Sequence, residues 1–202
     1  MNRSIGTGLL GAGIVLALSC GFSTAHAQDK IFGVTSTTFK DGQMMPKRVA
    51  NSRANFPQNA NCLGENVSPQ LSWFNAPAGT KSFAITMVDP EGRGGGGVNH
   101  WVAYGIPPDI TSFAEGEVSK DSPKYVGGKS RLGVGHYSGP CAPDAQVRHY
   151  TFVVIATDFD PKELPPGLTK EELNAKIVPP DPERRHDKAA AAIIGLFAKP
   201  TD

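Results

Sequence analysis

Short apolar runs bounded by turn residues recur through this chain and limit the folds open to it. The clearest are Lys81–Val88, His100–Ile106 and Tyr150–Thr157, which are rich in aromatic and β-branched residues. Runs of this length, too short for typical helices and flanked by glycine or proline, are typical of buried strands. The 23 glycines and 17 prolines supply many turns and irregular connections. The sequence therefore predicts a mainly β protein.

Weaker strand signals lie in the first half of the chain, and helix signals come late. We interpret Ile31–Phe39, Met44–Val49 and Gln70–Pro77 as further strands. Thr169, with a glutamate three residues later, has the form of a capping box and predicts a helix through LTKEELNAKI. Arg184–Lys199 contains a run of alanines with high helix propensity and is predicted as a second helix. This order indicates a β core with C-terminal helices.

Residues 1–27 have the features of a signal peptide. An arginine precedes the apolar run GLLGAGIVLAL, and Ala25-His26-Ala27 has the small-x-small form that signal peptidase cleaves. We expect cleavage after Ala27, export to the periplasm or the medium, and one mature domain over residues 28–202. A lipoprotein anchor at Cys20 is the alternative, although Ala17 stands where such sites usually have leucine.

The charge balance argues against several partner classes. The chain carries 20 basic and 19 acidic residues, a formal net charge of +1 at pH 7. Nucleic acid binding needs a basic face, and electrostatic membrane binding needs a polybasic cluster, so neither is predicted. The glycine-rich loop between Asp89 and His100 leads into an apolar run rather than a helix, which argues against a phosphate-binding P-loop. We expect no cofactor, no nucleic acid partner and no membrane-spanning segment.

Two cysteines, Cys62 and Cys141, stand in the expected mature chain. A disulfide between them is the default expectation, because oxidising compartments favour pairing. Such a bond would close a long loop and add roughly 3–4 kcal/mol to the free energy of unfolding on a chain-entropy estimate. Two buried thiols are the alternative.

Polar residues gather where the predicted strands begin and end. Asp89 closes one strand, His100 opens the next, and Gly139-Pro140 lies in a loop that leads to Arg148-His149-Tyr150. Loop residues held by rigid strands are common binding positions. The proline after Asp89 pushes that residue toward an extended conformation, which fixes its carboxylate at the strand end. Taken singly, a turn aspartate and a half-buried histidine are the commoner explanation of such positions.

Four segments in a fixed order carry a family resemblance. NVSPQLSWFNAPAGTKSFAITMVDPE, HWVAYGIP, GHYSGPCAP and HYTFVVIATD resemble the phosphatidylethanolamine-binding protein family, in its bacterial, Raf-kinase-inhibitor-like branch. The resemblance covers residues 61–158. It implies an antiparallel β-sandwich of two sheets with C-terminal helices. It also implies a small pocket at one end that accepts phosphate, acetate or a phospholipid head group.

The resemblance also implies which residues line the pocket. Asp89 matches the first acid of the family's DPD motif, His100 its pocket histidine, Gly139 and Pro140 the Gly-Pro of its rim, and Tyr150 the tyrosine of its HRY motif. We expect His100 to donate to an anion, and Asp89 to hold the other imidazole nitrogen or to accept from an ammonium group.

The chain departs from the family pattern around the pocket. The departures are Glu91 for the second aspartate, Arg93 for a proline, and Val98 and Asn99 for two tryptophans. Arg148 stands where the family has its second pocket histidine. Because residues i and i+2 of a strand share a face, Arg148 should lie on the side of Tyr150, with His149 on the other. We predict that Arg148 binds the ligand; reaching to solvent or pairing with an acid at the rim is the alternative.

Three function classes are compatible with these residues. The first is an exported binding protein for a small anion or a phospholipid head group, and it is the one we expect. The second is a protein-interaction module that inhibits a peptidase or a kinase-like partner. The third is a hydrolase that combines Asp89 and His100 with Ser138 or Cys141 as nucleophile. The sequence has no G-x-S-x-G elbow and no H-E-x-x-H metal motif, so neither catalysis nor a metal is expected.

Overall fold

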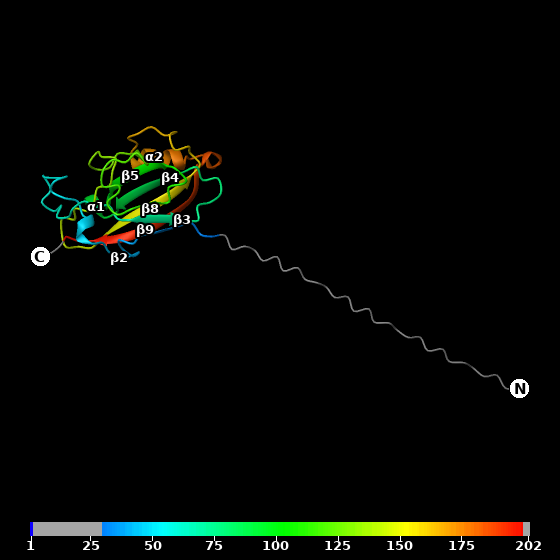
Figure 1. Cartoon of the computed structure of the whole chain (residues 1–202), viewed down its shortest axis with the longest axis horizontal. Helices are drawn as coiled ribbons and strands as arrows, with labels where there is room; N and C mark the ends of the chain where they lie inside the picture. Colours follow the sequence, from blue (N-terminus) through cyan, green and yellow to red (C-terminus); the bar gives the residue numbers. More distant parts are fainter. Residues whose placement is uncertain (2–29, 200–202) are drawn as a thin grey trace.

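A six-stranded sheet forms the centre of the molecule. The computed structural model describes Met1 and residues 30–199. The strand order is β2-β9-β8-β4-β5-β7, antiparallel throughout except for the parallel pair β2 and β9. The strands are β2 (Gln43–Met44), β4 (Ser82–Asp89), β5 (Val98–Ile106), β7 (Val126–Gly127), β8 (Arg148–Thr157) and β9 (Asp187–Phe197). Figure 1 shows β5, β4, β8 and β9 lying in this order. The three clearest strands of the sequence are thus confirmed as β4, β5 and β8.

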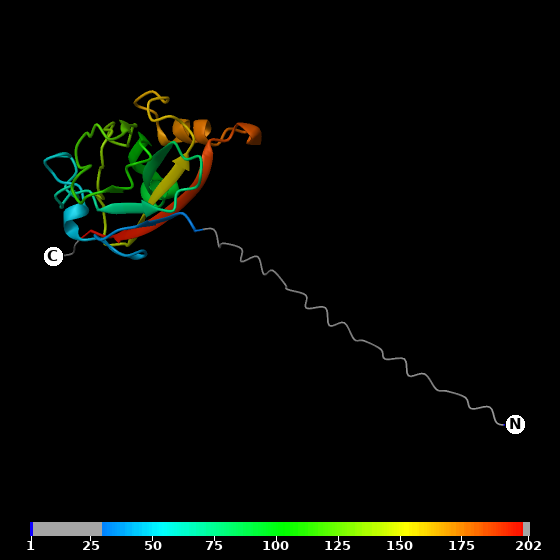
Figure 2. The same ribbon diagram turned by 45° about the vertical axis from the view of Figure 1, so that its right-hand side comes forward.

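A smaller sheet packs on one face of the large sheet (Figure 2). It has the antiparallel order β1-β3-β6, with β1 (Gly33–Thr35), β3 (Leu71–Phe74) and β6 (Ser112–Phe113). The core between the sheets is aromatic: Trp73 of β3 meets Phe83 of β4 edge-on, with ring centroids 5.6 Å apart. Such pairs add to the stabilisation from burial alone. The mainly β architecture of two sheets is therefore confirmed.

The other face of the large sheet is partly covered by the helix α2 (Lys170–Ile177), which Figure 1 shows above β4 and β5. Leu173 and Ile177 are buried against side chains of β4 and β5. The predicted capping box is confirmed: the Thr169 hydroxyl accepts from the Glu172 amide at 3.2 Å, and the Glu172 carboxylate accepts from the Thr169 amide at 2.9 Å. This cap satisfies amides that a helix start leaves without partners.

The helix predicted over Arg184–Lys199 is wrong. The chain makes one 3-10 turn, η2 (Pro182–Arg184), and then forms the strand β9, which runs antiparallel along β8. Burial alternates toward its end, where Ile193 and Phe197 face the core. The ladder satisfies the outer backbone groups of β8, and this tertiary pairing overrides the helix preference of the alanines.

The three weaker strand predictions differ from the structure in length. The chain forms short elements where longer strands were expected: β1 within Ile31–Phe39, β2 and the 3-10 helix η1 (Lys47–Val49) around Met44–Val49, and β3 within Gln70–Pro77. The glycine-rich loop contains a single distorted turn, α1 (Gly92–Gly95), before it enters β5.

The expected signal peptide lies, apart from Met1, outside the described residues, and so does Cys20. In the described part of the chain, no helix has the length and apolar character that crossing a membrane requires.

Candidate functional site

The β4–β5 connection brings Asp89 and His100 to one cavity. Asp89 ends β4, and its Oδ1 accepts a hydrogen bond from the Gly92 amide at 2.9 Å. The strand register shifts between the pairs Met87–Trp101 and Val88–Asn99, which leaves His100 as the extra residue of a β-bulge. Bulges commonly re-aim a side chain beside a functional site. The hairpin therefore supplies both an acid and an imidazole to the cavity wall.

The start of β8 supplies two more side chains to this cavity, whose volume is about 390 Å³. The rings of Tyr150 and His100 meet edge to face with centroids 5.2 Å apart. Nη1 of Arg148 lies 3.3 Å from Oδ2 of Asp89. Four of the six expected site residues thus lie together. The wall is completed mainly by Asn59, Asn61, Arg93, Val98, Arg131 and Cys141.

Gly139 and Pro140 stand behind the wall rather than in the lining that the described residues form. The Gly139 amide donates to Oδ1 of Asn66 at 2.9 Å, and the Pro140 carbonyl accepts from the Asn51 amide at 2.8 Å. A Cβ atom at position 139 would overlap the carbonyl oxygen of Val49. Glycine is therefore required here by close backbone packing. These contacts fix the segment that contains Ser138, whose carbonyl oxygen accepts the hydrogen bond from His100.

His100 is buried, and a hydrogen bond at one of its ring nitrogens holds the imidazole in place. Its Nδ1 lies 2.8 Å from the carbonyl oxygen of Ser138, and a carbonyl only accepts, so Nδ1 carries the proton. Burial lowers the pKa of His100 to about 4, and the charges of Arg131 and Arg148 lower it as well. Near neutral pH the imidazole is neutral, and its Nε2 is a hydrogen-bond acceptor. With its one proton engaged by Ser138, the neutral ring has no second N–H for an anion, so donation from His100 stays a prediction for the protonated ring.

Asp89 forms its hydrogen bonds with groups other than the His100 imidazole. Its carboxylate accepts from the Gly92 amide and from Arg148, so the expected contact with His100 is not the one that forms. Burial raises the pKa of Asp89 above its ordinary value, although the adjacent Arg148 opposes this shift. Each oxygen thus has one partner within the protein, and Asp89 also lines the cavity, where a carboxylate has further acceptor capacity.

Arg148 and His149 point to opposite sides of β8, as strand alternation predicts. Arg148 lines the cavity with a side chain that is 17% exposed, and it also lies 3.6 Å from the rim residue Asp144. His149 is half exposed and pairs outside with Glu91, their atoms 2.6 Å apart. Arg148 thus faces the cavity, as a ligand-binding residue would. It also pairs with acids, which was the alternative interpretation.

Two further arginines border the cavity: Arg93, which the sequence analysis named only as a departure from the family pattern, and Arg131, which it missed. Arg93 lies in the glycine loop with a φ of 54°, a left-handed conformation that costs a non-glycine residue about 1 kcal/mol or more. Arg131 lies in the loop after β7 and stacks on Phe56, its Cζ 5.2 Å from the ring centroid. Arg131 stands in no family motif that the sequence analysis used, so no local signal marked it.

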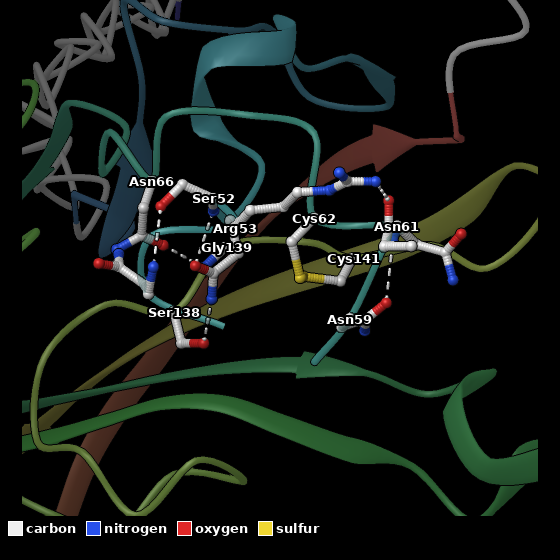
Figure 3. The surroundings of a disulfide bond; sticks show 12 residues. Ser52, Arg53, Asn59, Asn61, Cys62, Asn66, Ser138, Gly139 and Cys141 are labelled. Atoms are coloured by element: carbon white, nitrogen blue, oxygen red, sulfur yellow. Dashed lines mark hydrogen bonds between the residues drawn. A yellow bond between two sulfur atoms is a disulfide. The ribbon is translucent and has the colours of Figure 1, made fainter. Parts of the chain in front are cut away.

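A disulfide ties one cavity wall to the segment that supports His100. Cys62 and Cys141 are bonded, which confirms the expected pairing. Figure 3 shows Asn59 and Asn61 on one side of the bond and Gly139 on the other. Because Asn59, Asn61 and Cys141 all line the cavity, the bond keeps this loop against the ends of β5 and β8. Among the described residues, no group of three or more metal-ligating side chains lies close enough to hold an ion.

The geometry defines a class of protein: a sandwich of one large and one small sheet with a charged cavity at the ends of β4, β5 and β8. A family model described as phosphatidylethanolamine-binding protein matches residues 35–180. The chain belongs to this family, in the bacterial branch of YbcL-like, UPF0098 proteins.

Relatives and solved structures agree with this assignment. A UPF0098 protein of Aquifex aeolicus is 31% identical over 194 residues, covering 91% of this chain and 98% of the relative. The UPF0098 protein YbcL of Escherichia coli is 32% identical over 148 residues, covering 71% and 78%. The crystal structure of YbcL superposes with a TM-score of 0.68 at 28% identity, over 83% of this chain and 98% of YbcL. A phosphatidylethanolamine-binding protein homologue of Chlamydia trachomatis gives 0.67 at 28% identity, over 84% and 98%.

Proposed function

We propose that this protein is an exported binding protein whose cavity takes a small anion, such as phosphate or the phosphate of a phospholipid head group. The observation that carries the proposal is the meeting of Arg148, His100 and Tyr150 around one cavity. A guanidinium offers paired donors that match phosphate oxygens and stays charged at all working pH values. Membership in the family supports the same class of ligand.

Native mass spectrometry of the protein purified from its producing cells tests this proposal. We expect a bound species of low mass that contains phosphorus or another anion and is lost on mild activation. The control is the Arg148→Ala variant purified in parallel, which should carry less of that species. Wild-type protein that is always ligand-free and gains no mass with millimolar phosphate would contradict the proposal.

We propose binding without catalysis. Both candidate nucleophiles have other roles: Cys141 is in the disulfide, and the Ser138 hydroxyl accepts from Asn51 Nδ2 at 2.9 Å. His100 contacts the carbonyl of Ser138 rather than its hydroxyl, so it is not placed to activate that oxygen. Incubation with p-nitrophenyl acetate and p-nitrophenyl phosphate should give no release of nitrophenol above that with heat-inactivated protein, and release that is lost in Ser138→Ala would contradict this proposal.

We propose export as the setting of this activity. The Cys62–Cys141 disulfide supports it, because such bonds persist in oxidising compartments. A relative from Mycobacterium tuberculosis, 35% identical over 137 residues, bears the name "Putative lipoprotein LppC". N-terminal sequencing after cell fractionation tests the route. A mature chain that begins at residue 28 supports a cleaved signal peptide, whereas a lipid-modified Cys20 would replace it with an anchor.

A further inference from the structure

A second cavity lies next to the charged one, across the contact between Arg131 and Phe56. Its volume is about 370 Å³, within the range of about 300–1,000 Å³ that small-molecule sites occupy. We call it the amide cavity, because asparagines recur among the residues that line it: Asn51, Asn55, Phe56, Asn66, Leu132, Val134, His136, Tyr137 and Ser138. None of these residues lines the charged cavity. The two cavities are therefore separate hollows of the surface.

The stack of Arg131 on Phe56 divides the two cavities. Arg131 lines the charged cavity, Phe56 lines the amide cavity, and the guanidinium carbon lies 5.2 Å from the ring centroid. Figure 3 shows the same division around the disulfide: Asn66 of the amide cavity lies on one side of the bond, and Asn59 of the charged cavity lies on the other. Phe56 thus belongs to the wall that the two cavities share.

Hydrogen bonds fix the floor of the amide cavity. Nδ2 of Asn51 donates to the Ser138 hydroxyl at 2.9 Å, and Oδ1 of Asn51 accepts from the Ser52 amide at 2.8 Å. Nδ2 of Asn66 donates to the Tyr137 carbonyl at 3.2 Å. Each contact uses one of the two hydrogens or one of the two lone pairs of an amide group, so both side chains keep further capacity to donate and accept. Polar groups that are already held in place bind a ligand at a low entropic cost.

The accessible surface of the amide cavity lies at its rim. Asn55 is exposed there. The other rim residues are partly exposed: Phe56, Leu132, Val134 and His136. The rim therefore presents an aromatic ring and two aliphatic side chains beside an amide and an imidazole. A ligand that fits must combine an apolar face with several hydrogen-bonding groups.

The lining of the amide cavity carries little charge. Among the described residues that form it there is no lysine, arginine, aspartate or glutamate. His136 is the one side chain of this lining that can carry a charge near neutral pH, and its Nδ1 lies 2.9 Å from the carboxylate of Asp121, which stands outside the lining. A phosphate would find no arginine or lysine here, and an ammonium group would find no carboxylate in the lining. The chemistry of the cavity therefore fits a neutral ligand.

We propose that the amide cavity binds a neutral monosaccharide. A pyranose ring has an apolar C–H face, which can pack on the ring of Phe56, and its hydroxyl groups both donate and accept, as amide side chains do. The Asn55 amide and Nε2 of His136 are the polar rim groups that would contact these hydroxyls. This inference goes beyond the proposed function, because it concerns a different cavity and a ligand without charge.

NMR titration of ¹⁵N-labelled protein at pH 7 tests the inference with three probes in the millimolar range: D-glucose, D-galactose and N-acetyl-D-glucosamine. We expect at least one of these sugars to shift the backbone amide signals of residues 55–56 and 132–136. The signals of residues 148–150 at the charged cavity should stay in place. Inorganic phosphate, titrated separately, should do the reverse, because its proposed site is the charged cavity.

Two variants, with folding checked by circular dichroism, locate the bound sugar. Asn55→Ala removes an exposed amide and should weaken sugar binding about threefold or more, the scale of one neutral hydrogen bond. Val134→Trp places a large ring in the cavity and should abolish sugar binding. Gln58→Ala is the matched control, because it removes an exposed amide of the same loop that lines neither cavity. It should bind the sugar within about twofold of wild type, and all three variants should bind phosphate as wild type does.

The outcomes separate the sugar site from the proposed anion site. No shift with any of the three sugars overturns the inference, and so do sugar-induced shifts at residues 148–150 instead of the amide cavity. Sugar binding that is unchanged in Asn55→Ala and in Val134→Trp overturns it as well. None of these results bears on phosphate binding. If the expected sugar shifts appear but phosphate does not bind, the proposed function fails and the sugar site stands.

Discussion

The Nδ1 atom of His100 lies 2.8 Å from the carbonyl oxygen of Ser138, deep in the end of the sandwich. This contact fixes the ring, assigns its proton to Nδ1 and leaves Nε2 as an acceptor in a cavity that Arg131 and Arg148 also line. A motif histidine that the sequence suggests as a donor is therefore a neutral acceptor. ¹⁵N NMR of the labelled imidazole at pH 7 should show the tautomer with a proton on Nδ1, and the opposite tautomer would contradict this assignment.

The buried imidazole should make stability depend on pH. The pKa of His100 is about 4 in the folded protein, below the ordinary value of 6.5, so the unfolded chain binds more protons between these two values. Stability then rises with pH, is fully present above about 6.5 and falls by about 3 kcal/mol as pH drops to about 4. Urea unfolding at pH 7 and pH 4.5 should show a smaller loss in His100→Gln than in wild type, by about 2–3 kcal/mol.

The control for the pH experiment is His149→Gln, because His149 is half exposed and lies outside the cavity. It should retain the dependence of the wild type. An unchanged pH dependence in His100→Gln would show that His100 does not titrate as its burial implies.

The close packing of Gly139 predicts sensitivity to a single methyl group. Gly139→Ala should lower the free energy of unfolding by about 1–3 kcal/mol, because the added Cβ overlaps the backbone of residues 49–51. It should also weaken phosphate binding, since the neighbouring Ser138 carbonyl holds His100. Gly96→Ala is the matched control: its Cβ would have no contact closer than 3.5 Å and its φ is −78°. Denaturation of both variants gives the comparison, and equal stabilities would refute the packing argument.

Loss of the disulfide should weaken both the fold and the cavity. Cys62 and Cys141 are 79 positions apart, so a Cys62→Ser/Cys141→Ser variant should be less stable by about 4 kcal/mol on the chain-entropy estimate. Phosphate affinity should fall too, because the loop with Asn59 and Asn61 is released from the wall. Guanidinium denaturation and calorimetry on the oxidised wild type and the variant measure the two effects. Equal stability would mean that packing alone holds this loop.

The fold was predictable wherever local and tertiary preferences agree. The runs that became β4, β5 and β8 are rich in β-branched and aromatic residues, and both faces of β4 are buried. The capping box at Thr169 is a purely local interaction and was visible for that reason. The strand β9 was not, because its alanines favour a helix in isolation and only the pairing with β8 decides otherwise. The β-branched pair Ile193 and Ile194, followed by Gly195, was the one local signal against a helix.

The site was predictable where residues stand in motifs. Asp89, His100, Arg148 and Tyr150 lie together at the cavity, and Gly139 and Pro140 support it from behind. The position of Arg131 was not foreseeable, because only the course of the loop after β7 brings this residue to the cavity. The tautomer of His100 was equally hidden, since a backbone carbonyl sets it.

Phosphate affinity of two neighbouring single variants tests the account most directly. Arg148→Ala removes a guanidinium from the cavity wall, whereas His149→Ala removes a side chain that pairs with Glu91 outside it. Calorimetric titration at pH 7, with folding of each variant checked by circular dichroism, should show phosphate binding to wild type. It should be about tenfold or more weaker in Arg148→Ala and within about twofold in His149→Ala. A larger loss from His149→Ala, or no binding to wild type, would contradict the account.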